Sequence, residues 1–211
     1  MSAVDFQQSR NLGSIMASNN INPRDVTALI LAGGEGRRLG GQDKGLIHWQ
    51  ERPFIEYALD AVPSDISRTL ISCNRNIDQY QQYGETVQDN DARYEGPLAG
   101  IYAAMQVAST PFIFVLPCDS PLLPKDLYQH LAAALKISQA DICYVDDGIQ
   151  KQYLFALIRT SLKPSLKNYL ATGNRQVHRW YKQHQFVEAN LSEQQRAFRN
   201  VNRREDLVDL N

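Results

Sequence analysis

The chain has 211 residues, of which 43% are hydrophobic and 21% are charged, values typical of a soluble globular protein. Its formal net charge is −1, so no overall field attracts nucleic acid or an anionic membrane, and any anion site must be local. The length favours one domain. Cys73, Cys118 and Cys143 lie far apart without C-x-x-C spacing, which argues against a zinc site or a disulfide framework and fits a reducing cytosol.

The first 24 residues are polar and aperiodic, which predicts a mobile leader before a single domain over residues 25–211. They lack the apolar segment of a secretory signal, and Met16 is an alternative start. No later run reaches the roughly 18 apolar residues that span a bilayer. We therefore expect a cytoplasmic protein.

Alternating apolar runs and helical patterns follow this leader. Strands are expected over residues 26–32, 68–74, from 111, 141–146 and 153–159, with a short strand ending at Val87 and a turn at Asp147-Gly148. Helices are expected over residues 52–62, 78–84, 96–108, 125–138, 161–171, 175–184 and from 203. This alternation predicts an α/β protein, three-layer α/β/α and Rossmann-like, with a mostly parallel central sheet that binds ligands at the carboxyl ends of its strands.

A glycine-rich stretch, "LILAGGEGRRLGGQDKGL" (29–46), directly follows the first expected strand. Glycines let successive backbone N–H groups approach an anion, and Arg37, Arg38 and Lys44 add positive charge. The stretch therefore predicts a loop that cradles phosphates, and a solvated basic turn is the alternative.

The spacing within this stretch excludes two common phosphate-binding motifs. It is not a Walker loop, because Gly45 follows Lys44 where Ser or Thr is required. It is not a dinucleotide fingerprint either, because Leu39 stands where the third glycine after Gly34 and Gly36 belongs. An NAD-dependent oxidoreductase is accordingly disfavoured.

Carboxylates follow two other expected strands. Asp119 in "LPCDSPLLP" lies at the same sheet edge as the glycine-rich stretch, where a carboxylate beside phosphates typically holds Mg²⁺. The alternative is that Asp119 caps a helix that begins near Pro121. Asp89 and Asp91 follow the short strand in "VQDNDARYEGPLAG", and we interpret Asp91 as a turn residue.

These motifs in this order, L-A-G-G-x-G-x-R-[LM]-G-G-x-D-K-G-L, then G-P-L-A-G, then P-C-D-[ST]-P, resemble those of the molybdenum cofactor guanylyltransferases. The resemblance runs from Leu29 to about Leu123, with a weaker similarity in "FRNVNRREDL" (198–207). It implies transfer of GMP from GTP to the phosphate of molybdopterin, with release of pyrophosphate. The nucleotide would bind to about residues 25–123 and the acceptor to about 124–211.

The resemblance also implies roles for individual residues. Arg38, Lys44 and Asp119 would be catalytic, Asp119 would hold Mg²⁺, and the nucleotide would contact Leu31, Ala32, Gly33, Gly34, Lys44, Ser72, Asp89 and Asp119. Arg175, Asn200 and Asn202 would bind the acceptor. GTP and molybdopterin are the implied partners, together with transient contacts to cofactor biosynthesis proteins and molybdoenzyme chaperones; neither nucleic acid nor membrane is expected.

The chain departs from the family pattern at two places, and several residues have simpler readings. Ser72 replaces an Asn that contacts the nucleotide in many members, and Gln152-Tyr153 stands where relatives often have His-Pro. Lys44 is alternatively a solvated lysine and Asp89 a turn cap, and Asn200 and Asn202 alternatively cap the helix from Arg203. Arg175, with His178 and Arg179, alternatively lines a solvated helix face.

Two other functions compete with guanylyl transfer. A related nucleotidyltransferase would use CTP with molybdopterin or act on a sugar phosphate, although relatives that transfer cytidylyl groups more typically read L-A-A-G where this chain reads L-A-G-G. Gly34 favours guanine by that analogy. A non-catalytic carrier of molybdenum cofactor is the second competitor, and the presence of both Lys44 and Asp119 argues against it.

Overall fold

The computed structural model describes residues 21–33, 42–89, 96–202 and 205–206. Its strands are β1 (Val26–Leu31), β2 (His48–Trp49), β3 (Arg52–Pro53), β4 (Arg68–Ser72), β5 (Glu85–Val87), β6 (Phe112–Pro117), β7 (Ile142–Asp146), β8 (Lys151–Arg159) and β9 (Phe186–Asn190). Its α-helices are α2 (Phe54–Asp60), α3 (Ile77–Tyr80), α4 (Pro97–Val107), α5 (Leu127–Ser138), α6 (Lys163–Ala171) and α7 (Val177–Tyr181). Short 3-10 helices are η1 (Pro23–Asp25), η3 (Lys44–Leu46), η4 (Thr160–Leu162) and η5 (Ser192–Phe198).

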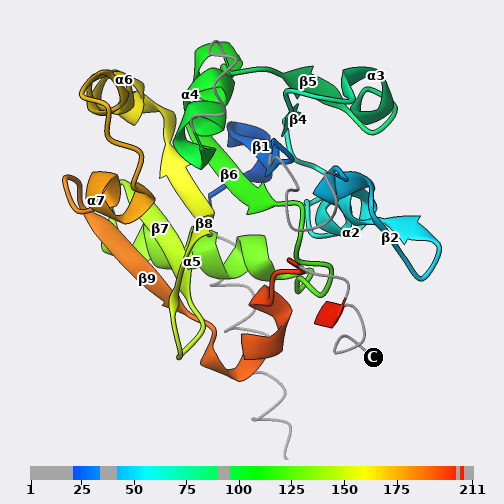
Figure 1. Cartoon of the computed structure of the whole chain (residues 1–211). Coiled ribbons are helices and arrows are strands. Elements are labelled where there is room, and N and C mark those ends of the chain that lie inside the picture. The colour runs from blue at the N-terminus through cyan, green and yellow to red at the C-terminus, as the bar shows by residue number, and fades with distance from the viewer. Residues whose placement is uncertain (1–20, 34–41, 90–95, 203–204, 207–211) are drawn as a thin grey trace, which may run out of the picture.

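Seven strands form the central sheet in the order β5-β4-β1-β6-β8-β7-β9, and β2 with β3 forms a separate hairpin. The pairs β4–β5, β1–β4, β1–β6 and β7–β9 are parallel, whereas β8 runs antiparallel to β6 and β7. The helices lie on the two faces of this sheet (Figure 1). The predicted three-layer α/β/α architecture with a mostly parallel sheet is confirmed.

Alternation along β6 shows why the expected strand is a continuous apolar run. Phe112, Phe114 and Leu116 pack into one buried cluster with α5, and Ile113 and Val115 pack into a second cluster with α4 and α6. A strand covered on both faces has no solvent side, so it needs no polar residue at alternate positions.

The predicted turn at Asp147-Gly148 joins β7 to β8 and explains why β8 is antiparallel. Gly148 has φ +85°, which suits glycine. Asp147 Oδ1 accepts hydrogen bonds from the backbone N–H groups of Ile149 at 2.9 Å and Gln150 at 2.8 Å. Gln152 Nε2 donates to Asp147 Oδ2 at 2.7 Å. Burial opposes ionisation of Asp147, but these hydrogen bonds outweigh it and lower the pKa of the carboxyl.

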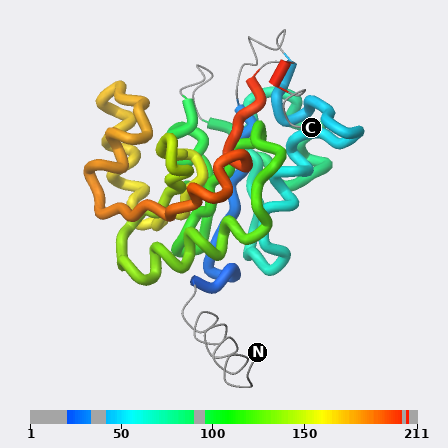
Figure 2. The backbone as a smooth tube through the Cα atoms, turned by 90° about the horizontal axis from the view of Figure 1, so that it is seen from below, coloured from blue at the N-terminus to red at the C-terminus, as the bar shows by residue number. Residues whose placement is uncertain are grey.

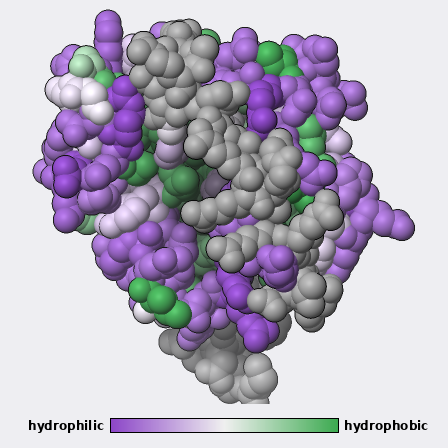
Figure 3. Space-filling model, viewed as in Figure 1, coloured by the Kyte–Doolittle hydropathy of each residue, from purple (hydrophilic) through white to green (hydrophobic). Residues whose placement is uncertain are grey.

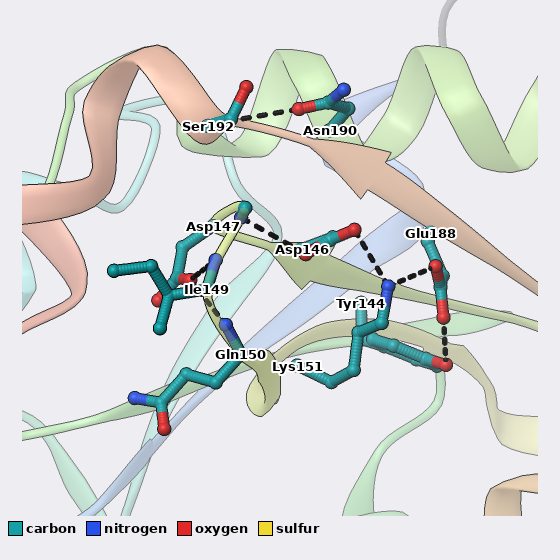
Figure 4. A network of polar contacts seen from close by, with 10 residues as sticks. Tyr144, Asp146, Asp147, Ile149, Gln150, Lys151, Glu188, Asn190 and Ser192 are labelled. Carbon is teal, nitrogen blue, oxygen red and sulfur yellow. Dashed lines mark hydrogen bonds and ion pairs between the residues drawn. The ribbon is translucent and has the colours of Figure 1, made fainter.

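A polar network joins three neighbouring strands beside this turn (Figure 4). Lys151 Nζ of β8 contacts Asp146 Oδ2 of β7 at 2.7 Å and Glu188 Oε2 of β9 at 2.5 Å. Tyr144 of β7 donates to Glu188 at 2.8 Å. The network pairs these charges with one another between the carboxyl end of β7, the start of β8 and the middle of β9.

The sequence did not predict strand β9 or the hairpin of β2 and β3. β9 is an edge strand whose five residues are mostly exposed, so it lacks the buried run that identifies an inner strand. Several expected helices are also shorter than predicted. The helix expected over 52–62 begins only at Phe54, because Arg52 and Pro53 pair in the hairpin before α2. The helix expected over 175–184 covers only Val177–Tyr181 as α7. Apart from residues 205 and 206, the helix expected over 203–210 lies outside the described residues.

The N-terminal end of the described chain is part of the fold. Ile21 is buried in the α5 cluster, and its carbonyl accepts a hydrogen bond from Tyr128 at 2.7 Å. The sequence pattern predicts residues 21–24 as part of the leader, whereas the structure places them on the domain. The rest of the predicted leader lies outside the described residues.

The exposed surface carries few large apolar side chains. In the described residues these are Val107, Leu122, Ile137, Ile149 and Phe186, which lie on different segments. The face drawn in Figure 3 is mainly hydrophilic, with small separate apolar areas. Among the helices that the structure describes, none has the length and apolarity needed to cross a membrane.

Candidate active site

Three adjacent parallel strands, β4, β1 and β6, end together at one edge of the sheet. Backbone hydrogen bonds continue past the strand ends: Ala32 N donates to Ser72 O at 2.8 Å, and Cys118 N donates to Leu31 O at 3.1 Å. The first strand is therefore held on both sides as far as Ala32, and the chain leaves the sheet at Gly33. The predicted positions Leu31, Ala32 and Gly33 lie in the middle of this edge.

Lys44 and Asp119, predicted from separate motifs, are in contact at this edge. Lys44 begins η3, and Asp119 is the second residue after the end of β6. Lys44 Nζ lies 2.8 Å from Asp119 Oδ2. The same ammonium donates to Asn202 Oδ1 at 2.7 Å. The Lys44 side chain is 23% exposed and that of Asp119 is 12% exposed. The interpretation of Lys44 as a solvated loop lysine therefore does not describe its surroundings.

The second carboxylate oxygen of Asp119 is the atom whose surroundings most suggest a ligand. Oδ1 is buried and has no hydrogen-bond partner among the residues placed by the structure. A buried carboxylate oxygen without a partner is costly, so it points to an ion or molecule that binds there. The capping alternative does not apply, because the next helix, α5, begins at Leu127 after Asp126.

The C-terminal segment lies against the same carboxylate residue. Val201 N donates to the backbone oxygen of Asp119 at 2.8 Å, and Ser120 Oγ donates to Asn200 Oδ1 at 2.7 Å. In Figure 2 this segment, drawn in red, runs over the strand edge. Two predicted acceptor residues, Asn200 and Asn202, are thus brought to the predicted nucleotide residues.

Ser72 and Gly100 pack closely behind this edge. Ser72 is 5% exposed at the end of β4 and faces helix α4. A Cβ added to Gly100 would lie 2.5 Å from Ser72 Oγ and 3.1 Å from Leu31 Cδ2, so the helix approaches the strands this closely because residue 100 has no side chain. Ser72 therefore fills space against α4.

We expect Gly100→Ala to destabilise the protein, although alanine favours a helix over glycine by about 1 kcal/mol. Overpacking against Ser72 and Leu31 should lower the free energy of unfolding by about 1–3 kcal/mol, measured by urea denaturation. Ser72→Ala removes the nearest clashing atom and should reduce the penalty. An equal penalty in both backgrounds would show that this contact is not its cause.

Asp89 pairs with the residue that ends the neighbouring strand region. Asn74 Nδ2 donates to Asp89 Oδ1 at 2.7 Å, and Asp89 N donates to Asn74 Oδ1 at 3.3 Å. Because β4 and β5 are parallel, these residues meet at the same edge as Lys44 and Asp119. The structure thus assigns Asp89 a partner that keeps its carboxylate at the candidate site.

Comparison with known proteins identifies the family. The model of the MobA-like NTP transferase domain matches residues 28–188. The chain belongs to this family. It is 41% identical over 186 residues to the molybdenum cofactor guanylyltransferase of Shewanella halifaxensis, covering 88% of this chain and 93% of that protein, and 39% identical to that of Shewanella piezotolerans, covering 88% and 91%.

A solved structure supports the same fold for this MobA-like transferase. The molybdopterin-guanine dinucleotide biosynthesis protein A of Archaeoglobus fulgidus has a TM-score of 0.70 and 21% sequence identity, covering 87% of this chain and 95% of that one. The family assignment also establishes that the chain is a nucleotidyltransferase, as the sequence predicted.

The remaining residues that the sequence singles out in this MobA-like domain either contact residues other than Lys44 and Asp119 or lie outside the described part of the chain. Arg175 Nη1 donates to the carbonyls of Leu170 and Asn174, both at 2.8 Å, as a cation at the end of helix α6 commonly does. Figures 1 and 2 place α6 and α7 across the molecule from α2. Gly34 and Arg38 lie outside the described residues, as do Arg37 and Asp91.

The three cysteines lie in the interior of the described fold. Cys73, Cys118 and Cys143 are free and buried. Burial, with a smaller contribution from Asp43, raises the pKa of Cys73 to about 11. The thiols therefore stay neutral and pack as small apolar groups.

Sequence reasoning missed a second group of polar residues beside Lys44. Asp43 accepts hydrogen bonds from Tyr80 and from Asn76, and Gly45 packs against the Tyr80 ring. Asp43 is the aspartate of the D-K-G part of the first motif, but nothing in the sequence links it to Tyr80.

Proposed function

We propose that this chain transfers GMP from GTP to the phosphate of molybdopterin, which releases pyrophosphate and forms the guanine dinucleotide cofactor. Family membership and the names of the curated relatives support this reaction. The observation that carries the proposed site is Asp119 Oδ1, which lies beside the ammonium of Lys44, is buried and has no hydrogen-bond partner within the described part of the chain. A cation and a carboxylate at one point suit a metal–triphosphate complex.

In this reaction the nucleophile is a substrate phosphate, so the protein has to position the reacting groups and does not have to supply a nucleophile. An oxygen of the molybdopterin phosphate attacks the α-phosphorus of GTP, a new P–O bond forms, and the bond to the β-phosphate breaks. The attacking phosphate is already largely ionised near neutral pH, so no general base is required. Alignment and charge neutralisation account for catalysis of such transfers.

Lys44, at the start of η3, supplies a fixed positive charge at the edge where the central strands end. Its contacts with Asp119 and Asn202 hold the ammonium at the strand edge before any ligand binds. In the proposed complex it donates to the β- and γ-phosphate oxygens and stabilises the departing pyrophosphate. Arg38, which precedes it in the glycine-rich stretch, is proposed to assist.

Asp119 is the residue that fits Mg²⁺. Within the described residues, no three Asp, Glu, His or Cys side chains gather into a protein-only metal site. Magnesium is commonly held by one or two carboxylates together with substrate phosphates, and Asp119 Oδ1 offers the matching oxygen. When bound, the ion would neutralise charge on the phosphate oxygens.

The acceptor is proposed to approach along the C-terminal segment. Asn200 is held by Ser120 and Asn202 contacts Lys44, so both amides lie beside the proposed reaction centre. Arg175 remains a prediction for the acceptor phosphate. Transient contacts with cofactor biosynthesis proteins and molybdoenzyme chaperones also remain predictions of the resemblance.

Nucleotide choice tests the proposal against its competitors. With Mg²⁺ and molybdopterin, we expect pyrophosphate release from GTP and at least about 10²-fold slower release from CTP, a discrimination within the range of positioned hydrogen bonds. Omitting molybdopterin is the control for GTP hydrolysis. Turnover with CTP but not GTP would reassign the substrate, and molybdopterin binding without pyrophosphate release from any nucleotide would favour the carrier.

A further inference from the structure

A buried carboxylate immediately precedes Lys44 and faces a different element. Asp43 is 7% exposed, and its Oδ2 accepts a hydrogen bond from Asn76 Nδ2 at 3.1 Å. Its Oδ1 accepts a hydrogen bond from the hydroxyl of Tyr80 in helix α3. Asp43 occupies the N-cap position of η3, yet its side chain does not cap that helix. The carboxylate is used instead to connect the lysine segment to α3.

The partners of Asp43 are themselves fixed. The Tyr80 side chain is fully buried, and this burial is the largest cause that raises the pKa of its hydroxyl, with a smaller contribution from the Asp43 carboxylate. The hydroxyl therefore stays protonated and donates. Asn76 adopts φ +51°, a left-handed conformation that Asn tolerates, and its amide reaches Asp43 from there. A buried carboxylate requires such donors, because an unpaired charge in the interior is costly.

Gly45 leaves the space that this contact needs. An added Cβ would overlap the Tyr80 hydroxyl and lie 3.1 Å from Cε1 of the ring. The backbone of Gly45 does not have a positive φ, so the requirement is for space rather than for conformation. Three consecutive residues therefore have linked roles: Asp43 binds Tyr80, Lys44 carries the ammonium that contacts Asp119, and Gly45 leaves room for the Tyr80 ring.

We propose that Asp43, Asn76 and Tyr80 form a clamp that positions the Lys44 ammonium, making Asp43 and Tyr80 positioning residues of the transfer reaction. The clamp connects Lys44 to the β4–α3 side of the site, while Asp119 connects it to β6. Backbone hydrogen bonds from Leu46 to Asp43 and from Ile47 to Lys44, at 3.1 and 3.2 Å, join the two residues in one turn. The inference rests on the proposed role of Lys44.

Tyr80→Phe tests the clamp, because it removes only the hydroxyl and keeps the buried ring. We expect kcat/KM for GTP to fall about tenfold, since a small misplacement of a catalytic group costs up to about 10²-fold. In a Lys44→Ala background the same substitution should change kcat/KM by less than about twofold, because coupled residues are not additive. Tyr57→Phe, which removes a hydroxyl bonded to Trp49 O at 2.7 Å, is the matched control and should leave transfer unchanged.

The outcomes separate this inference from the proposed function. A Tyr80→Phe loss of equal size in both backgrounds, or no loss in the native one, would overturn the clamp while leaving the role of Lys44 intact. A Lys44→Ala variant with native activity would overturn both. Asp43→Asn, which keeps an acceptor for Tyr80, should retain more activity than Asp43→Ala at equal folded fraction, checked by circular dichroism. Equal activity of these two variants would also contradict the clamp.

Discussion

Replacing Asp119 with asparagine is expected to lower kcat of nucleotidyl transfer by about 10³-fold, equivalent to about 4 kcal/mol of lost transition-state stabilisation. The change keeps the size of the side chain and an acceptor for Lys44 but removes the charge that the proposed Mg²⁺ requires. Asp119→Ala, which removes both carboxylate oxygens, should abolish transfer. The measurement is pyrophosphate release at saturating GTP and molybdopterin.

The fold should survive both substitutions. The backbone oxygen of Asp119 that accepts from Val201 N is unchanged, so the C-terminal segment stays docked. Circular dichroism and thermal melting check this. Asp126→Asn, which alters an exposed carboxylate 3.2 Å from His130, is the matched control and should have the native rate. Native rates in the Asp119 variants would refute the metal role.

Replacing Lys44 with alanine should reduce kcat/KM for GTP by about 10²-fold, the usual size of one charged contact to a developing anion. Lys44→Arg should restore little of this, because the planar guanidinium cannot reproduce the ammonium between Asp119 and Asn202. Steady-state kinetics with varied GTP measure the effect.

Loss of an ion pair must be distinguished from loss of a phosphate contact. Lys151 also pairs with two carboxylates, at 2.7 and 2.5 Å, so Lys151→Ala removes a comparable pair between β7, β8 and β9. We expect its KM for GTP to be native. If Lys151→Ala and Lys44→Ala raise this KM equally, the effect of Lys44 is general electrostatics, and the assigned contact is wrong.

The architecture followed from apolar patterning because the inner strands are covered on both faces. Runs such as that of β6 have no polar residue to obscure them, and the Asp147-Gly148 turn marks the antiparallel strand. The pattern failed at β9, where a mostly exposed edge strand buries little. It also overextended α7, since helical spacing continues through residues that make turns.

Only part of the candidate site could be predicted from the sequence. Lys44 and Asp119 belong to segments that the pattern places at the same edge of the sheet, and their contact agrees with that reasoning. The Asp43–Tyr80 contact was not predictable, because Tyr80 lies on a four-residue helix with no motif. Nor does the sequence reveal that Ser72 packs against Gly100, since the close approach of helix to strand is a property of tertiary packing.

A crystal structure with GTP and Mn²⁺ in place of Mg²⁺ tests the central claim most directly, because both ions accept oxygen ligands and Mn²⁺ is located by its anomalous scattering. We expect the metal at about 2.1 Å from Asp119 Oδ1. We also expect Lys44 Nζ at about 2.8 Å from a phosphate oxygen of the nucleotide. A metal bound away from Asp119, or a triphosphate bound away from the ends of β1, β4 and β6, would contradict the account.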